Sequence, residues 1–123
     1  MGHLTFALSM QRALTELRET TGSDFPSQQL AVLFDIAAHP ETSIGDCAKR
    51  LGMTTSSTSR AVAALANWSW TKKEGYGLVE KVEDMYESRR KLVRLTQQGN
   101  RLVNKMQEKF EEVSNAKTRG KTD

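Results

Sequence analysis

The stretch that decides the fold runs from Ser43 to Leu65 and reads SIGDCAKRLGMTTSSTSRAVAAL. Its first four residues place a hydroxyl three positions before a carboxylate, which is the capping-box pattern of a helix start. Gly52 supplies the backbone freedom for a sharp turn, and the hydroxyl-rich run Thr54–Arg60 then opens a second helix. Two helices joined by a turn of three or four residues form a helix-turn-helix, whose second helix suits the major groove of DNA.

Two β-leaning runs follow this motif. Leu78–Val82 and Lys91–Leu95 are rich in aliphatic residues, and the second run places apolar residues alternately at 93 and 95. The polar segment between the runs contains the adjacent arginines Arg89 and Arg90. The sequence therefore predicts a hairpin with a basic tip after the second helix of the motif.

Thr96 and Gly99 mark the start of a further helix. Thr96 is suited to cap its N-terminus, and Gly99 leaves room for another stretch of backbone to approach the first turn. The apolar spacing that follows predicts a long C-terminal helix from Gln97 to about Val113.

Three stretches, in this order along the chain, match one known pattern. Phe25–Leu33 has a glutamine four residues before a leucine, and Ser56–Arg60 begins the second motif helix with serines and an arginine. Gly77–Lys81 and Leu95–Gly99 bracket the hairpin, with three charged residues between them: Asp84, Glu87 and Arg89. The region from about residue 25 to 105 thereby resembles the winged helix-turn-helix of the MarR family of bacterial transcription regulators.

This resemblance implies a mainly α fold with a small β-hairpin wing, in which the winged helix-turn-helix is flanked by N- and C-terminal helices. We expect a single domain over residues 1–113, with the flanking helices at 4–21 and 97–113. Residues 114–123 contain one apolar side chain and three basic ones, so we expect them to form a disordered basic tail.

Apolar spacing also predicts which face of each helix is buried. In the helix that follows Pro26, the predicted inward residues are Leu30, Leu33, Phe34 and Ala37. In the second motif helix they are Thr58, Val62 and Leu65.

The opposite face of that second helix carries small hydroxyl groups, which can bond to several base edges and let the backbone approach a groove closely. Thr54 is also suited to be the N-cap, and Arg60 either holds a phosphate or pairs with a carboxylate of the domain. Glu87 can hold the guanidinium of Arg89, so that arginine is either structural or a minor-groove contact. The predicted contacts to double-stranded DNA are Thr54, Thr55, Ser56, Ser57, Ser59, Arg60, Lys72, Lys73, Arg89, Arg90 and Lys91.

The segment 66–77 is longer than the link that usually precedes the wing in the family. They contain Trp68 and Trp70, followed by Lys72 and Lys73. One interpretation is a longer helix and a loop whose tryptophans pack on the domain. The other is a contact surface, in which the lysines reach phosphate and a tryptophan anchors a protein partner or a second subunit. The alternative function is then a winged-helix interaction module acting on transcription or replication machinery.

Each flanking helix carries an apolar stripe that needs a partner surface. The stripes are Phe6, Met10, Leu14 and Leu17, and Leu102, Met106, Phe110 and Val113. They either pack on each other within one chain or form a two-fold homodimer. A homodimer would place two recognition helices, the second motif helix of each chain, about 34 Å apart and predict a palindromic site.

Because many members of the family release DNA on binding a small aromatic acid, the resemblance also implies a small-molecule effector.

Composition excludes several classes of protein. The 123 residues carry 18 Lys+Arg against 15 Asp+Glu, so a nucleic-acid surface must come from local clustering of charge. The one cysteine, Cys47, excludes an internal disulfide and suits the cytoplasm, and we expect a buried thiol rather than a redox switch. His3 and His39 show no metal-ligand spacing with it, so we expect no metal, cofactor, catalytic residue or enzymatic activity. No apolar run is long enough to span a membrane.

Overall fold

The computed structural model describes residues 2–67, 77–83, 86 and 91–122, with side chains up to residue 115. The chain forms two compact units, Phe25–Asn100 and the pair of segments Met1–Asp24 and Arg101–Asp123. The terminal segments, which are far apart in sequence, form a compact unit of their own. The single domain over residues 1–113 stays a prediction.

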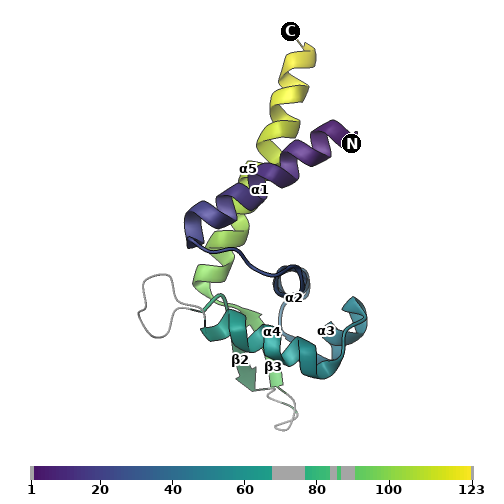
Figure 1. The fold of residues 1–123 in the computed structure, drawn as a ribbon, viewed down its shortest axis with the longest axis vertical. Helices are drawn as coiled ribbons and strands as arrows, with labels where there is room; N and C mark the ends of the chain where they lie inside the picture. Colours follow the sequence, from purple (N-terminus) through teal and green to yellow (C-terminus); the bar gives the residue numbers. More distant parts are fainter. Residues whose placement is uncertain (1, 68–76, 84–85, 87–90, 123) are drawn as a thin grey trace. The chain divides into compact units, whose positions relative to one another are not determined.

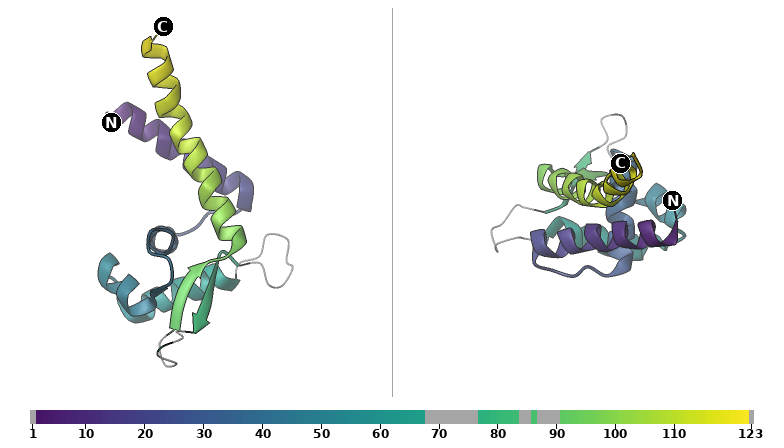
Figure 2. Two further views of the ribbon diagram at one scale, coloured as in Figure 1. Left: turned by 180° about the vertical axis from the view of Figure 1, so that it is seen from behind. Right: turned by 90° about the horizontal axis from the view of Figure 1, so that it is seen from above.

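The central unit contains the helix-turn-helix and a small sheet (Figures 1 and 2). Its helices are α2 (Ser27–Ala38), α3 (Ile44–Leu51) and α4 (Thr55–Asn67), and its strands are β1 (Thr42–Ser43), β2 (Val79–Glu83) and β3 (Lys91–Leu95). The strands are antiparallel in the order β1-β3-β2. The predicted hairpin is confirmed as β2 and β3, whereas β1 was not predicted, because two residues carry no alternation and form a strand only by pairing with β3.

Local signals set the ends of the motif helices as the sequence predicted. The Ser43 hydroxyl caps α3 by accepting a hydrogen bond from the backbone N–H of Asp46 at 3.1 Å. Gly52 ends α3 with φ of 65°, in the left-handed region that glycine enters at little cost. The Thr54 hydroxyl accepts from the backbone N–H of Ser57 at 3.0 Å, so Thr54 is the N-cap of α4.

Leu78 is the point at which α4, the wing and α5 (Gln97–Thr122) meet. Its backbone N–H donates to the Leu65 carbonyl at 2.9 Å, and its own carbonyl accepts from the N–H of Thr96 at 3.1 Å. The Thr96 hydroxyl donates to the carbonyl of Gly77 at 2.6 Å and accepts from the N–H of Gly99 at 3.0 Å. The predicted cap at Thr96 is confirmed, and these bonds fix the base of the wing to both helices.

Two glycines make this joint possible. A Cβ built on Gly99 would lie 2.1 Å from the carbonyl oxygen of Leu78, and one built on Gly77 would lie 1.9 Å from the carbonyl oxygen of Ala66. No side chain fits at such distances. The close approach predicted for Gly99 is confirmed, and Gly77 serves the same purpose at the end of α4.

The buried faces of the central helices agree with the sequence prediction in α4 but not in α2. In α4 the buried residues are Thr58, Ala61, Val62 and Leu65, which include all three predicted. In α2 they are Val32, Leu33, Asp35 and Ile36, while Phe34 is 39% exposed. Because α2 is apolar on nearly every side, spacing alone did not determine its inward face.

The other unit pairs α1 (His3–Thr21) with the part of α5 that begins at Arg101. The guanidinium of Arg12 lies 3.3 Å from the carboxylate of Glu112, which joins the two helices. Gly22 ends α1 in the left-handed region, where its N–H donates to the Arg18 carbonyl at 2.7 Å. The buried stripe of α1 consists of small residues and one leucine: Thr5, Ser9, Ala13, Leu17 and Thr21.

The residues of the two predicted apolar stripes differ in exposure. Leu17, Leu102 and Met106 are buried within the chain. Phe6, Met10 and Leu14 are exposed, and Phe110 and Val113 are half-buried. The small residues of α1 therefore form its buried face, and its larger apolar side chains are exposed.

The predicted end of the C-terminal helix is also wrong. The backbone of α5 continues past Val113 to Thr122, where the sequence analysis predicted a disordered tail. Residues 114–122 contain no proline, so every residue there has the backbone N–H that a helix requires.

Candidate nucleic-acid interface

The outer face of α4 carries most of the predicted contact residues. Thr58, Val62 and Leu65 are completely buried, which fixes the rotation of the helix about its axis. The opposite side is consequently open to solvent. Of the residues predicted there, Thr54, Thr55, Ser56 and Arg60 are exposed, and Ser57 and Ser59 are partly exposed.

Hydrogen bonds order the first turn of this face. The Thr54 hydroxyl donates to the Ser57 hydroxyl at 2.9 Å, in addition to capping the Ser57 N–H. Arg60 directs one guanidinium nitrogen at the Ser57 hydroxyl at a distance of 3.4 Å. Among the described residues no carboxylate forms an ion pair with Arg60. Of the two interpretations of Arg60, its surroundings favour a guanidinium that is held outward and available to a ligand.

Cross-strand ion pairs line the wing. Glu80 faces Arg94 and Glu83 faces Lys91 in the register of β2 and β3. Arg94 donates through Nε to one oxygen of Glu80 at 2.9 Å, and its Nη2 lies 2.8 Å from the same oxygen in an ion pair. The ammonium of Lys91 lies 3.5 Å from the Glu83 carboxylate, with both side chains more than half exposed. An exposed pair of this kind is weak, so Lys91 can exchange its partner for a phosphate.

The remaining predicted contacts are not placed by the structure. Lys72, Lys73, Arg89 and Arg90 lie outside the described residues, as do the tryptophans of the insertion, Trp68 and Trp70.

Solved structures identify the fold. No protein-family model and no curated protein sequence matches the chain. A mutant of S. aureus MepR, bound to an oligodeoxyribonucleotide, matches with a TM-score of 0.66 and 26% identity, over 90% of this chain and 74% of that one. The PcaV transcriptional regulator from Streptomyces coelicolor, in complex with its natural ligand, matches with a TM-score of 0.59 and 26% identity, over 94% and 75% of the two chains. A MarR family transcription regulator designated SP03579 matches with a TM-score of 0.62 over 96% and 67%, although its identity is 16%. The chain has the MarR-like winged-helix fold.

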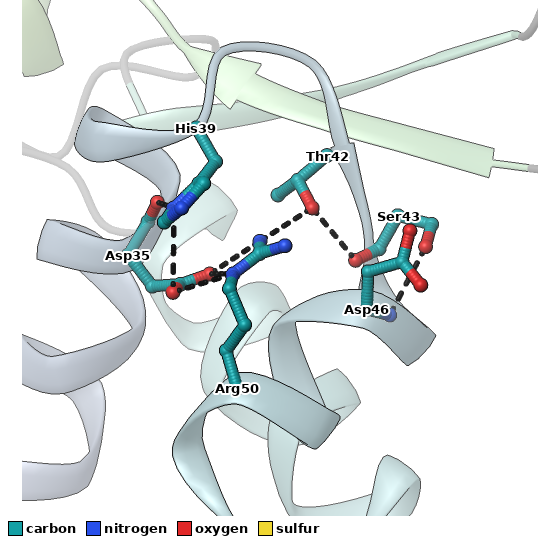
Figure 3. Close-up of polar contacts among 6 residues, drawn as sticks. All are labelled: Asp35, His39, Thr42, Ser43, Asp46 and Arg50. Carbon is teal, nitrogen blue, oxygen red and sulfur yellow. Dashed lines mark hydrogen bonds and ion pairs between the residues drawn. The ribbon is translucent and has the colours of Figure 1, made fainter.

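Within this MarR-like fold, an ion pair fixes α3 against α2 (Figure 3). The guanidinium of Arg50 donates three hydrogen bonds to the carboxylate of Asp35, at 2.8, 2.9 and 3.2 Å. It donates a fourth to the Thr42 hydroxyl at 2.6 Å. His39 adds a nitrogen 3.5 Å from the same carboxylate. Because α3 leads into the recognition helix, this network positions that helix without touching its outer face.

The charge on Asp35 is stabilised in spite of its burial. Its side chain is 6% exposed, and desolvation alone would raise its pKa. The hydrogen bonds from Arg50 outweigh that effect and hold the pKa of Asp35 below its ordinary value of 3.8. No signal in the sequence predicted this pair, because its members lie fifteen positions apart on different helices.

Cys47 lies next to the same carboxylate. It is 1% exposed, and burial, together with the neighbouring Asp35, raises the pKa of its thiol to about 12. The thiolate is the reactive form of cysteine. The predicted burial of the thiol is therefore confirmed, and its raised pKa disfavours a redox switch.

The outer face of α4 includes one residue that the sequence analysis missed. Asn67 is exposed, and it follows Ser56 and Arg60 at helical spacing, eleven and seven residues further on. An asparagine amide can pair with adenine in the major groove. Extending the helical period beyond the hydroxyl-rich turn would have identified it.

Two further kinds of site find no support in the described part of the chain. It contains no group of three or more His, Cys, Asp or Glu side chains arranged to hold a metal ion. None of its helices is both long and apolar enough to cross a membrane.

Proposed function

We propose that the chain is a non-enzymatic, sequence-specific regulator of transcription that binds double-stranded DNA. The observation that carries this proposal is the outer face of α4, where Ser56, Arg60 and their hydroxyl neighbours face solvent beside a wing of alternating charge. The relative MepR, 26% identical, was solved bound to an oligodeoxyribonucleotide, and the fold match supports the same activity here.

In this proposal α4 enters the major groove. Short hydroxyl side chains let its backbone approach the bases, while Arg60 binds a guanine edge or a phosphate. Lys91 and the predicted tip residues Arg89 and Arg90 would follow the adjacent backbone or minor groove. The lysines Lys72 and Lys73 remain predicted phosphate contacts.

We further propose that the chain acts as a homodimer on a palindromic site. The proposal rests on the apolar flanks of α1, where Leu4 is 72%, Phe6 51% and Leu8 41% exposed, and Met10 and Leu14 are 37% and 38% exposed. Five large apolar side chains on one helix are costly to leave in water. A second copy of the chain would cover them and repeat the recognition helix about one DNA turn away. Phe110 and Val113 of α5 remain part of this proposed interface.

A small-molecule effector completes the proposal. PcaV was solved with its natural ligand, which supports regulation of this chain by a ligand as well. The alternative function, a protein-interaction module that uses Trp68 and Trp70, depends on residues outside the described set and stays a prediction.

Selection of bound duplexes from a random pool, repeated at two salt concentrations, tests the function. A regulator of this kind enriches a palindrome, and log Kd changes linearly with log salt in proportion to the phosphates neutralised. Light scattering of the free protein should show a species of twice 13.8 kDa. Recovery of no consensus at low salt would reject sequence-specific binding. Protein capture without a DNA footprint would favour the interaction module.

A further inference from the structure

A cavity of about 300 Å³ lies entirely within the central unit. Its walls are the last turn of α2, the turn that follows it, the end of β3 and the first turn of α5. This volume is at the lower end of the range of about 300 to 1,000 Å³ that is usual for ligand pockets, so the cavity suits a small metabolite. None of its lining residues belongs to the outer face of α4.

The lining combines an apolar wall with one cation and one anion. Ile36, Ala37 and Leu95 supply aliphatic surface, while Arg94 and Glu41 supply the opposite charges. Ile36 is almost completely buried, so the accessible part of the apolar wall comes mainly from the half-buried Ala37 and Leu95. A molecule that fits here presents an apolar group to that wall and a charge of each sign to the rim.

Arg94 is prepared to bind a carboxylate. Its Nε donates a hydrogen bond to Glu80 at 2.9 Å, and its Nη2 lies 2.8 Å from the same carboxylate oxygen, so this edge of the guanidinium faces Glu80. The third nitrogen, Nη1, lies 3.5 Å from Glu41, at the limit of hydrogen-bond distance. Arg94 and Glu41 are 47% and 53% exposed. A long ion pair with this exposure is weak, so each partner can exchange the other for a group of a ligand.

The backbone of Glu41 supports a role for its carboxylate. Its φ of 57° lies in the left-handed region, and it is the one non-glycine residue with positive φ among those the structure describes. This conformation is strained for a residue with a Cβ. Glycine or asparagine would adopt this left-handed conformation with less strain. The strained backbone holds the glutamate carboxylate at the rim of the cavity.

We propose that this cavity binds a small zwitterion with an apolar substituent, namely an apolar α-amino acid. The ligand carboxylate binds the outer edge of the Arg94 guanidinium, and the ligand ammonium binds Glu41. The side chain of the ligand lies against Ile36, Ala37 and Leu95. The amide of Asn100, which also lines the cavity, supplies a further polar contact.

Occupation of the cavity would separate Arg94 from Glu41 and so break one side-chain contact between strand β3 of the wing and the turn after α2, while the pairing of β1 with β3 keeps the two elements joined. The uncoupled arrangement is the one in which this ion pair is broken. A ligand that prefers the uncoupled arrangement changes DNA affinity by its difference in affinity for the two arrangements. This consequence, unlike binding itself, rests on the proposed function.

The test is an NMR titration of the DNA-free protein with L-leucine as the probe. Two truncated analogues separate the charges: 4-methylpentanoate lacks the ammonium and 3-methylbutylamine lacks the carboxylate. Leucine should shift the amide resonances of Glu41 and Arg94 saturably at millimolar concentration. Each analogue should bind at least about tenfold more weakly, corresponding to about 1.4 kcal/mol.

Three variants test which side chains bind the charged groups of leucine. Glu41→Gln should weaken leucine binding about tenfold or more while leaving the weak binding of 4-methylpentanoate unchanged, and Arg94→Lys should weaken the binding of both. Glu83→Gln, which removes a paired carboxylate of the same hairpin that does not line the cavity, should change neither. Overlay of the unliganded spectra shows whether each variant is folded.

Three results would overturn the proposal: no saturable shift with leucine, shifts confined to residues outside the cavity, or binding of 4-methylpentanoate as tight as that of leucine. Since the titration contains no DNA, these results leave the proposed function intact. Leucine binding by a protein that selects no DNA would instead reject the function and keep the site.

Discussion

The guanidinium of Arg50 in α3 donates three hydrogen bonds to the buried carboxylate of Asp35 in α2. Paired hydrogen bonds of this kind fix both distance and orientation. The same guanidinium reaches Thr42 of β1. One side chain therefore joins α2, α3 and β1 of the central unit, and its removal should affect the stability of that unit.

We predict that Arg50→Met destabilises the protein. The substitution keeps most of the aliphatic stem but leaves the Asp35 carboxylate, 6% exposed, without its principal donor. An unsatisfied buried acceptor costs about 1–3 kcal/mol, and urea unfolding should show a loss of this size. The matched control is Arg18→Met, which breaks an ion pair of the same 2.8 Å length whose side chains are 67% and 80% exposed. Equal losses in the two variants would contradict the role given to burial.

The same ion pair predicts a pH dependence. The hydrogen bonds from Arg50 hold the pKa of Asp35 below 3.8, its ordinary value. The folded state thus favours the ionised form more than the unfolded state does, and the resulting stabilisation is fully present above about pH 5. It is lost as the pH falls through 3.8 towards the lower pKa of the folded state. The difference in free energy of unfolding between the wild type and Asp35→Asn should narrow over that range. A constant difference from neutral to acidic pH would show that the pKa is not lowered.

Three glycines provide a matched test of the joint at the base of the wing. A Cβ at Gly99 would lie 2.1 Å from a backbone oxygen, and one at Gly77 would lie 1.9 Å from another. Neither oxygen belongs to a flexible side chain, so Gly99→Ala and Gly77→Ala should each lower the free energy of unfolding by about 3 kcal/mol. Gly45→Ala is the control, since a Cβ there meets nothing within 4 Å inside α3. It should raise stability by about 0.5–1 kcal/mol, measured by the same unfolding assay.

The features that the sequence predicted well are set by neighbouring residues. Ser43 and Thr54 cap their helices through backbone groups three positions away, and Gly52 ends α3 through its own torsion angle. Such signals are independent of the rest of the fold. The hairpin was likewise predictable, because its two strands are paired along their whole length by alternating residues.

The features that it missed depend on distant residues. Ser9 and Ala13 form the buried face of α1, although larger apolar residues on the same helix remain exposed. Hydrophobic spacing identifies the larger apolar residues and gives no sign that small residues form the buried face. The pairing of Asp35 with Arg50, and the strand β1, likewise appear only when separate elements have assembled.

Cys47 should be inert in the folded protein. Its thiol is 1% exposed, and desolvation and the nearby Asp35 raise its pKa to about 12. Reaction with a disulfide reagent at mildly alkaline pH should be slow and limited by unfolding, and it should be complete after addition of urea. Reaction of the native protein at the rate of a free thiol would revive the redox switch that the structure disfavours.

Substitutions on the buried face of α4 should affect stability, whereas substitutions on its exposed face should affect DNA recognition. Thr58 is completely buried, and its hydroxyl donates to the Thr54 carbonyl at 2.9 Å. Thr58→Ala should therefore lower the free energy of unfolding by about 1 kcal/mol while leaving the selected DNA sequence unchanged. Arg60 is exposed and bonds only weakly to Ser57. Arg60→Ala should leave the free energy of unfolding unchanged. If the guanidinium contacts a base, the variant should lose selection at one base pair; if it neutralises a phosphate, the slope of log Kd against log salt should fall by about one. If Arg60→Ala alters neither the sequence nor the slope, the outer face of α4 does not contact DNA and the proposed function loses the observation on which it stands.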